Sequence, residues 1–228
     1  MKLAHLVAVA FACALLLAQS PSAVLNLTAT TANVAGAPDP VRIEILRWST
    51  DDERDRLLAA WEQKESGTGA GKAAAKGTGK GAAKGKGAAK GPGPSGAGGA
   101  VPTPEAALTR ALQEATTVGY LWSSEVSGYA LRYAGKIDDP DGSQRIILIT
   151  QRRLGAVNQV WRPTVEGAAN SYEFSVIELR LNAKGQGEGK VSLTGKIAPD
   201  AAAKVVTVEN YNALPVVLRD VRKQVIHP

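Results

Sequence analysis

The sequence predicts a mainly β protein, in which an antiparallel meander forms a sandwich or a partly closed barrel and carries two short helices. From residue 118 onward, apolar and polar residues alternate in short runs separated by tight-turn residues, a pattern typical of successive strands. Such short connections favour antiparallel pairing, because parallel neighbours need a long crossover. A segment of Lys, Gly and Ala precedes these strands and is predicted to join the two helices.

Residues 1–23 have the features of a secretory signal peptide. Lys2 precedes an apolar run over residues 3–18, and small residues follow this run. The run is shorter than the roughly 20 residues that a membrane helix needs. Cys13 offers a lipoprotein acylation site as an alternative, but it lies inside the apolar run and lacks the expected leucine before it. We therefore expect an exported protein, periplasmic or extracellular, with no transmembrane segment in its mature chain.

The charge of the protein is concentrated in one segment. The formal net charge is +6, and the excess comes from the Lys, Gly and Ala segment, so the rest of the mature chain is nearly neutral. Sequence-specific binding of nucleic acid is therefore not expected. Because Cys13 is the only cysteine, the exported domain has no disulfide and depends on its apolar core.

The mature chain divides into three predicted parts of one domain. Residues 24–64 hold two strands and the first helix, and residues 101–228 hold the second helix and the remaining strands. Residues 65–100 form an insertion for which we expect disorder. This insertion has no large apolar side chain, and its many glycines weaken a helix.

Two strands and a helix are predicted before the insertion. Residues 24–30 alternate apolar and polar side chains, and residues 41–46 do so again after a Gly- and Pro-rich turn at 33–40. The helix begins at Thr50, because a Thr cap followed three residues later by Glu53 satisfies free backbone N–H groups at both positions.

The two helices each carry an apolar stripe. The first helix ends near Lys64, and the second begins at Pro104 and runs to about Ala115. Since the insertion joins them, their facing ends are expected to lie close together. The stripes are Leu57, Leu58 and Trp61 in the first helix, and Leu108, Ala111 and Leu112 in the second.

The remaining chain is a succession of predicted strands with one irregular connection. Residues 152–171 have no clear periodicity, and long loops of this kind are more often functional or mobile than ordinary. Tight turns are predicted at residues 138–142, 182–187 and 198–200. The strands are predicted at residues 118–123, 129–134, 145–151, 172–182, 189–197, 203–211 and 215–223.

Several stretches of the chain resemble a family of uncharacterised exported bacterial proteins. The resemblance begins at residues 42–58, with Arg-Trp-Ser-Thr-Asp-Asp-Glu-Arg at 47–54, and continues at residues 118–120, 131–134 and 177–181. It covers most of the mature chain apart from the insertion, which departs from the shorter link in the family. The resemblance implies secretion and no known activity, so it does not imply a mechanism.

The sequence lacks the side chains on which most catalytic and metal sites depend. Its two histidines are His5, in the signal peptide, and His227, next to the last residue. Without cysteine as well, the mature chain has no parts for a zinc site, a cysteine nucleophile or a Ser-His-Asp triad. We therefore expect a protein that is not an enzyme and needs no cofactor.

Two acidic clusters have a simpler explanation than calcium binding. Acidic residues in the first turn suit the dipole of a helix, and the acids of the turn at 138–142 lack the later ligands of a calcium loop. The Gly-rich run at 185–189 leads into a strand, so we interpret it as a hairpin and not as a dinucleotide fingerprint. The clusters are Asp51, Asp52, Glu53 and Asp55, and Asp139 and Asp141 before Gly142.

Two groups of residues are candidates for binding. The first is an aromatic set that lines a groove if its members share one face of the sheet, although aromatic residues also serve in the core of strands. The second is the set of lysines in the insertion, which suits an anionic envelope polymer or lipid surface or serves only as a solubilising linker. The sets are Tyr120, Trp122, Tyr129, Tyr133, Trp161 and Arg162, and Lys72, Lys76, Lys80, Lys84, Lys86 and Lys90.

These observations favour one function and leave two alternatives. The favoured function is an exported, non-enzymatic binding or structural module of the cell envelope. The first alternative is a barrel-like carrier of a small apolar ligand, and the second is a hydrolase that works through carboxylates.

Overall fold

The computed structural model describes residues 23–67, 102–122, 128–156, 160–165 and 170–224. Nearly all of the predicted signal peptide and residues 68–100 of the predicted insertion lie outside these described residues. No helix among the described residues is long and apolar enough to cross a membrane.

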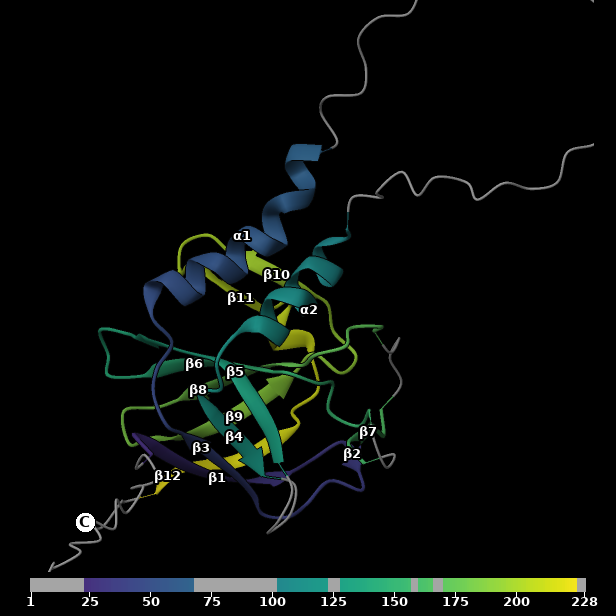
Figure 1. Ribbon diagram of the computed structural model, residues 1–228. Coiled ribbons are helices and arrows are strands. Elements are labelled where there is room, and N and C mark those ends of the chain that lie inside the picture. Colours follow the sequence, from purple (N-terminus) through teal and green to yellow (C-terminus); the bar gives the residue numbers. More distant parts are fainter. Residues whose placement is uncertain (1–22, 68–101, 123–127, 157–159, 166–169, 225–228) are drawn as a thin grey trace, which may run out of the picture.

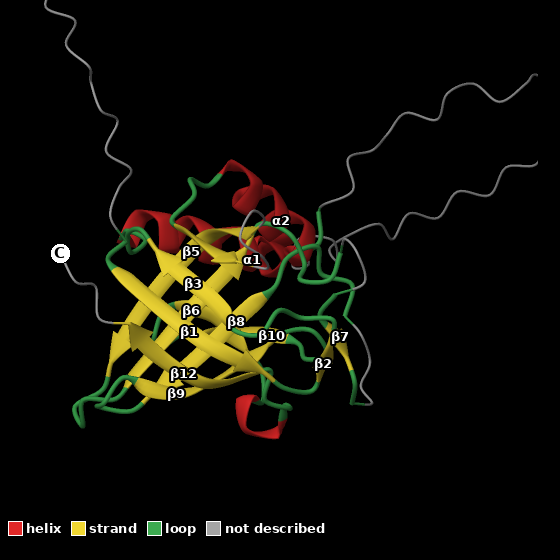
Figure 2. Ribbon diagram, turned by 90° about the horizontal axis from the view of Figure 1, so that it is seen from below, coloured by secondary structure: helices red, strands yellow, loops and turns green. Residues whose placement is uncertain are grey.

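Eight antiparallel strands form a closed barrel (Figures 1 and 2). This confirms the predicted antiparallel meander. Of the two predicted architectures, a sandwich and a partly closed barrel, the structure shows a barrel, and this barrel is fully closed. Around the barrel the strands are β1 (Leu25–Thr31), β12 (Leu218–Gln224), β9 (Gln186–Val191), β8 (Val176–Leu181), β6 (Gln144–Thr150), β5 (Gly128–Asp138), β4 (Gly119–Trp122) and β3 (Val41–Ile45).

The two ends of the described chain close the barrel. β1 pairs with β3 on one side and with β12 on the other, with Asn26 opposite both Glu44 and Gln224. The other neighbours are barrel strands that follow each other in the chain, with further elements between some of them, including two helices between β3 and β4 and a hairpin between β9 and β12. Closure leaves the barrel without the free edges that an open sheet exposes.

The interior of the barrel is filled with apolar side chains. The alternation in β3 places Val41, Ile43 and Ile45 inside, each with no exposed surface, as the period of a strand requires. Side chains from the other strands meet them in one buried cluster, which includes Leu121, Leu131 and further residues such as Ile146, Leu148, Ile177, Leu179, Leu218 and Val221.

A second layer covers the outside of β5, β6 and β8. It consists of α1 (Asp51–Gly67), α2 (Pro104–Glu114) and the hairpin of β10 (Ile197–Asp200) and β11 (Val205–Val208), and the two helices lie side by side above the barrel in Figure 1. A separate apolar cluster lies beneath this layer, with Leu57, Leu108, Leu112, Tyr133, Ile147, Ile149, Phe174, Val176, Val205 and Val208 among its members. The protein therefore has an inner core and an outer core on the two faces of one wall.

Both helices begin as the sequence predicts. Thr50 accepts a hydrogen bond from the Glu53 amide, and Glu53 accepts one from the Thr50 amide at 2.9 Å, so each side chain satisfies a free backbone group. Thr103 accepts from the Ala106 amide at the start of α2.

The prediction was wrong over the segment that follows β9. The predicted strand at 189–197 is split, because β9 ends at Val191 and β10 begins at Ile197. The predicted turn at 198–200 is part of β10, with Pro199 opposite Val206 in a two-stranded sheet. Proline is tolerated in such an edge strand, so its turn signal was misleading here.

The irregular connection between β6 and β8 contains a short strand. β7 (Arg162–Pro163) pairs with β2 (Val34–Ala35). β2 lies inside residues 33–40, which the sequence predicts as a turn. A 3-10 turn, η1 (Tyr211–Ala213), lies between β11 and β12. None of these short elements shows a sequence period of its own.

Candidate functional site

The structure separates the six residues of the predicted aromatic groove. Tyr120 and Trp122 are half-buried neighbours on β4, with ring centroids 5.3 Å apart. Tyr129 and Trp161 belong to the inner core, Tyr133 belongs to the outer core, and Arg162 is exposed on β7. The six residues therefore do not face one common surface.

A bulge in β5 explains why Tyr129 and Tyr133 lie on opposite sides of the wall. The register of β5 against β6 shifts between Leu131 and Tyr133, and the extra residue turns the following side chain to the other face. Burial beneath the helices raises the pKa of Tyr133 to about 12.

The acidic residues at the start of α1 are engaged with arginines. Arg47 donates two hydrogen bonds to Glu53, at 2.7 and 2.8 Å, and these bonds lower the Glu53 pKa to about 2 despite partial burial. Arg54 pairs with Asp51 and Asp55. Within the described ranges, no three acidic or histidine side chains form a group that could hold a metal ion.

The acids of the β5–β6 connection stabilise the turn itself. Asp141 accepts from the Ser143 amide at 2.9 Å, and Asp139 accepts from the Ser143 hydroxyl at 3.1 Å. Gly142 has a φ of 81°, which glycine adopts without strain. The predicted lysine contacts, Lys72, Lys76, Lys80, Lys84, Lys86 and Lys90, lie outside the described residues.

A charged cluster that the sequence analysis missed lies beneath the β10–β11 hairpin. Glu178 on β8 is fully buried and accepts two hydrogen bonds from Arg180, at 3.0 Å each, and one from the Thr207 hydroxyl. Arg145 on β6 lies 3.5 Å from Glu178 and 2.7 Å from Asp200 on β10. The Arg145 hydrogen bond lowers the pKa of Asp200.

Tyr211 in η1 extends this cluster toward β9. The Arg180 guanidinium lies 3.7 Å from the centroid of the Tyr211 ring, and the Lys190 amine lies 4.6 Å from it. Lys190 is buried and donates to the Tyr211 carbonyl at 2.7 Å, and burial raises the pKa of the Tyr211 hydroxyl. The cluster pairs its charges internally and attaches the hairpin and η1 to the barrel wall, so we assign it a structural role.

The groove between α1 and α2 is the best candidate for a binding site. It has a volume of about 620 Å³, within the range of small-molecule sites. Apolar and small side chains form most of its surface: Leu57 and Ala60 from α1, Ala107 and Ala111 from α2, and Ala115 and Pro102 beside α2.

Charged side chains surround this groove. Arg56 and Arg110 are exposed, one on each helix, and neither pairs with a carboxylate of the described residues. Arg132 on β5 also lines the groove, and it donates hydrogen bonds to the Ala115 carbonyl and the Gln151 side chain, at 2.6 and 2.7 Å. Of the acids that line the groove, Glu53 is neutralised by Arg47, and Glu114 is exposed.

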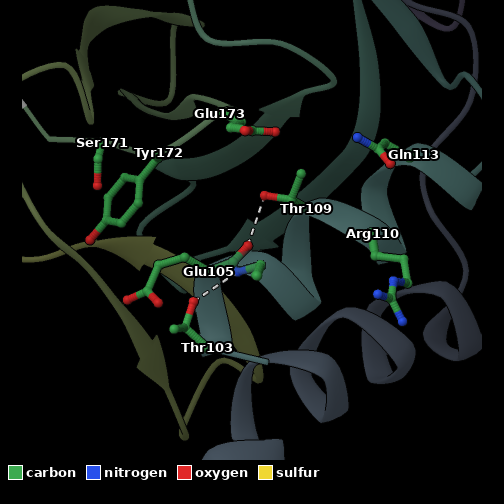
Figure 3. A pocket seen from close by; sticks show the side chains of 9 residues that line it. Thr103, Glu105, Thr109, Arg110, Gln113, Ser171, Tyr172 and Glu173 are labelled. Carbon is green, nitrogen blue, oxygen red and sulfur yellow. Dashed lines mark hydrogen bonds between the residues drawn. The ribbon is translucent and has the colours of Figure 1, made fainter. Parts of the chain in front are cut away.

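A second hollow lies on the other side of α2, against residues 171–173 (Figure 3). Its volume is about 660 Å³, and its lining includes the acids Glu105 and Glu173 together with Thr103, Thr109, Gln113 and Tyr172. Arg110 also borders it, but Figure 3 shows this side chain extending toward α1 and away from Glu105. The second hollow is therefore more polar than the interhelical groove and has an acidic lining.

Neither the groove nor the charged cluster has a strong signal in the sequence. The groove is lined by alanines, whose side chains have no functional group that a sequence motif could reveal. Its exposed arginines, at positions 56 and 110, are 54 residues apart in the chain. Alternation in β6 and β8 could have drawn attention to Arg145 and Glu178, since both stand next to apolar residues in strands.

The comparisons with known proteins found no protein similar to this chain. A scan against protein-family models found no match, and neither the curated proteins nor the solved structures gave a match.

Proposed function

We propose that this protein is an exported, non-enzymatic binding module of the cell envelope, in which the barrel is a rigid support and the α1–α2 groove is the binding surface. The observation that carries this proposal is the groove itself. Apolar side chains from two helices form its floor, and arginines that have no carboxylate partner among the described residues line it as well. The groove lies on the outside of a filled barrel.

The filled interior favours the binding-module hypothesis over the alternative hypothesis, a carrier that holds a small apolar ligand inside the barrel. Interior residues such as Ile43, Leu121 and Leu148 have no exposed surface and belong to one buried apolar cluster. Barrels of eight strands can be filled by their own side chains or hold one small ligand. With this packing, a ligand inside would have to displace core side chains, so we place the binding surface outside.

The state of the buried Glu178 and the half-buried Asp200 supports a non-enzymatic role. Glu178 and Asp200 both face Arg145, at 3.5 and 2.7 Å. A pair of carboxylates that works in hydrolysis needs one group that holds a proton at the working pH. The arginine instead favours the ionised form of Asp200, which suits a structural ion pair.

Binding of a neutral fluorescent dye tests the proposed site. Nile red shifts its emission to the blue when it enters an apolar site, so titration of the mature protein should give a saturable blue shift. Ala107→Leu, which places a larger side chain in the groove, should remove this shift. Ala59→Leu is the matched control, because Ala59 is exposed on α1 and does not line the groove. A shift that survives Ala107→Leu unchanged, or a wild type that gives no saturable shift, would contradict the proposed site.

A further inference from the structure

We infer that the α1–α2 groove takes a small amphiphilic anion, with an apolar chain on the alanine floor and an acidic head group at the arginines. This inference rests on the proposed function and names the ligand class for the same groove. It depends on the charge balance at the rim, the burial of the floor and the size of the hollow.

The floor provides an apolar surface of the right shape for a single chain. Leu57 and Ala60 are 5% and 8% exposed, so they form a closed base between the helices. Ala107 and Ala111 are one helical turn apart on α2 and leave space above this base because their side chains are small. Burying the methylene groups of a ligand on this surface removes them from water and is favourable.

The rim carries excess positive charge. Arg56, Arg110 and Arg132 line the groove, and none of them pairs with a carboxylate of the described residues. Glu53 is already bound in two hydrogen bonds from Arg47. Only Glu114 therefore offsets the three arginines among the residues that line the groove.

The arrangement of the arginines directs this charge to the groove. Arg132 is fixed by its hydrogen bonds to the Ala115 carbonyl and Gln151, so its charge stays in the lining of the groove. Arg110 extends toward α1 in Figure 3, and Arg56 stands on the facing helix. An acidic head group between them would accept charge-assisted hydrogen bonds from two elements.

The size of the groove favours a small molecule over a polymer segment. A hollow of about 620 Å³ suits a ligand of drug size. The second hollow has a similar volume, but Glu105 and Glu173 in its lining disfavour an anion. We therefore assign the anion to the interhelical groove.

Calorimetric titration with three ligands that share a ten-carbon chain tests this inference. Decanoate, decylammonium and decyl maltoside are added separately to the mature protein at low ionic strength. Decanoate should bind about tenfold tighter than decylammonium, and added salt should weaken the binding of decanoate. Arg56→Gln/Arg110→Gln should weaken decanoate binding about tenfold, because it removes two ion pairs that are exposed and therefore individually weak.

A matched double variant controls for the change in net charge. Arg219 and Arg222 are exposed on β12, on the opposite side of the barrel from the helices (Figure 1). Arg219→Gln/Arg222→Gln should leave decanoate affinity unchanged. Equal affinity for decylammonium, or decanoate affinity unaltered by Arg56→Gln/Arg110→Gln, would overturn the inference.

The dye titration separates failure of the ligand class from failure of the site. If Nile red binds and Ala107→Leu removes it while decanoate shows no preference, the anion inference is wrong and the binding site stands. If neither Nile red nor any of the three ligands binds, both the site and the ligand class are wrong.

Discussion

Arg145 on β6 donates a 2.7 Å hydrogen bond to Asp200 on β10 and thereby joins the barrel wall to the hairpin outside it. The same guanidinium lies 3.5 Å from Glu178, whose side chain is only 1% exposed. Removing one partner of a buried ion pair is strongly destabilising, because it leaves the other group without full compensation. Arg145 therefore stabilises both the buried wall and the outer layer.

Arg145→Met should lower the free energy of unfolding by about 3 kcal/mol, because it leaves Glu178 buried with one fewer cation. Urea unfolding at pH 7 measures this loss. Arg219→Met is the control, since Arg219 is exposed on β12, and should change stability by less than about 0.5 kcal/mol. A loss for Arg145→Met as small as that of the control would refute the anchoring role.

Glu53 should contribute stability that acid removes. Its pKa falls from 4.5 to about 2 in the folded protein, mainly through the hydrogen bond from Arg47. Because the folded pKa is the lower one, this contribution is present above about pH 4.5 and is lost as the pH falls toward 2.

Glu53→Gln should therefore be less stable than wild type at pH 7, and the difference should shrink between pH 5 and about 2. Thermal unfolding across this range measures it. Since Glu53 is 20% exposed, we expect a modest difference at pH 7, of about 1 kcal/mol. A difference between the two proteins that is constant from pH 7 to 2 would contradict the assignment.

Gly135→Ala should destabilise the outer core through Tyr133. A Cβ atom at position 135 would lie 2.8 Å from the Tyr133 ring carbon Cζ, and Tyr133 is only 4% exposed. We expect a loss of about 1 to 3 kcal/mol, as for other overpacked cores. In a Tyr133→Leu background the same substitution should cost less. Equal costs in both backgrounds, from denaturant unfolding, would show that the contact with Tyr133 is not the cause.

The sequence predicts the regular parts of this fold because their signals are local. Val41, Ile43 and Ile45 alternate with polar residues and are buried as expected, and Thr50 with Glu53 marks the start of α1. Closure of the barrel depends instead on the pairing of β1 with β12, the first and last strands, and no local pattern encodes such a contact.

The site is harder to predict than the fold for a related reason. Tyr133 shares a strand with Tyr129, and only the bulge after Leu131 places the two rings on opposite faces of the wall. The groove is formed by small residues such as Ala107, which sequence patterns do not distinguish from other helix residues. Its arginines become neighbours only when the helices pack.

Replacing residues 68–100 with a Gly/Ser linker of about ten residues should leave the melting temperature within about 2 °C of wild type. The replaced segment has no large apolar side chain to contribute to a core. The same variant should lose any binding of the protein to an anionic polymer at low salt, because it removes all six lysines of the segment. A drop of several degrees in the melting temperature would contradict the expectation that the segment adds nothing to the core. Unchanged polymer binding would contradict the expectation that its lysines bind the polymer.

Chemical-shift mapping with decanoate tests the central claim, that the α1–α2 groove is the binding surface, most directly. Two-dimensional NMR spectra of the protein are recorded during titration with decanoate. We expect the largest amide shifts at Leu57, Ala60, Ala107 and Ala111, which line the groove, and little change in β1, β9 and β12. Shifts concentrated in the barrel strands, or no saturable shifts in either helix, would contradict it.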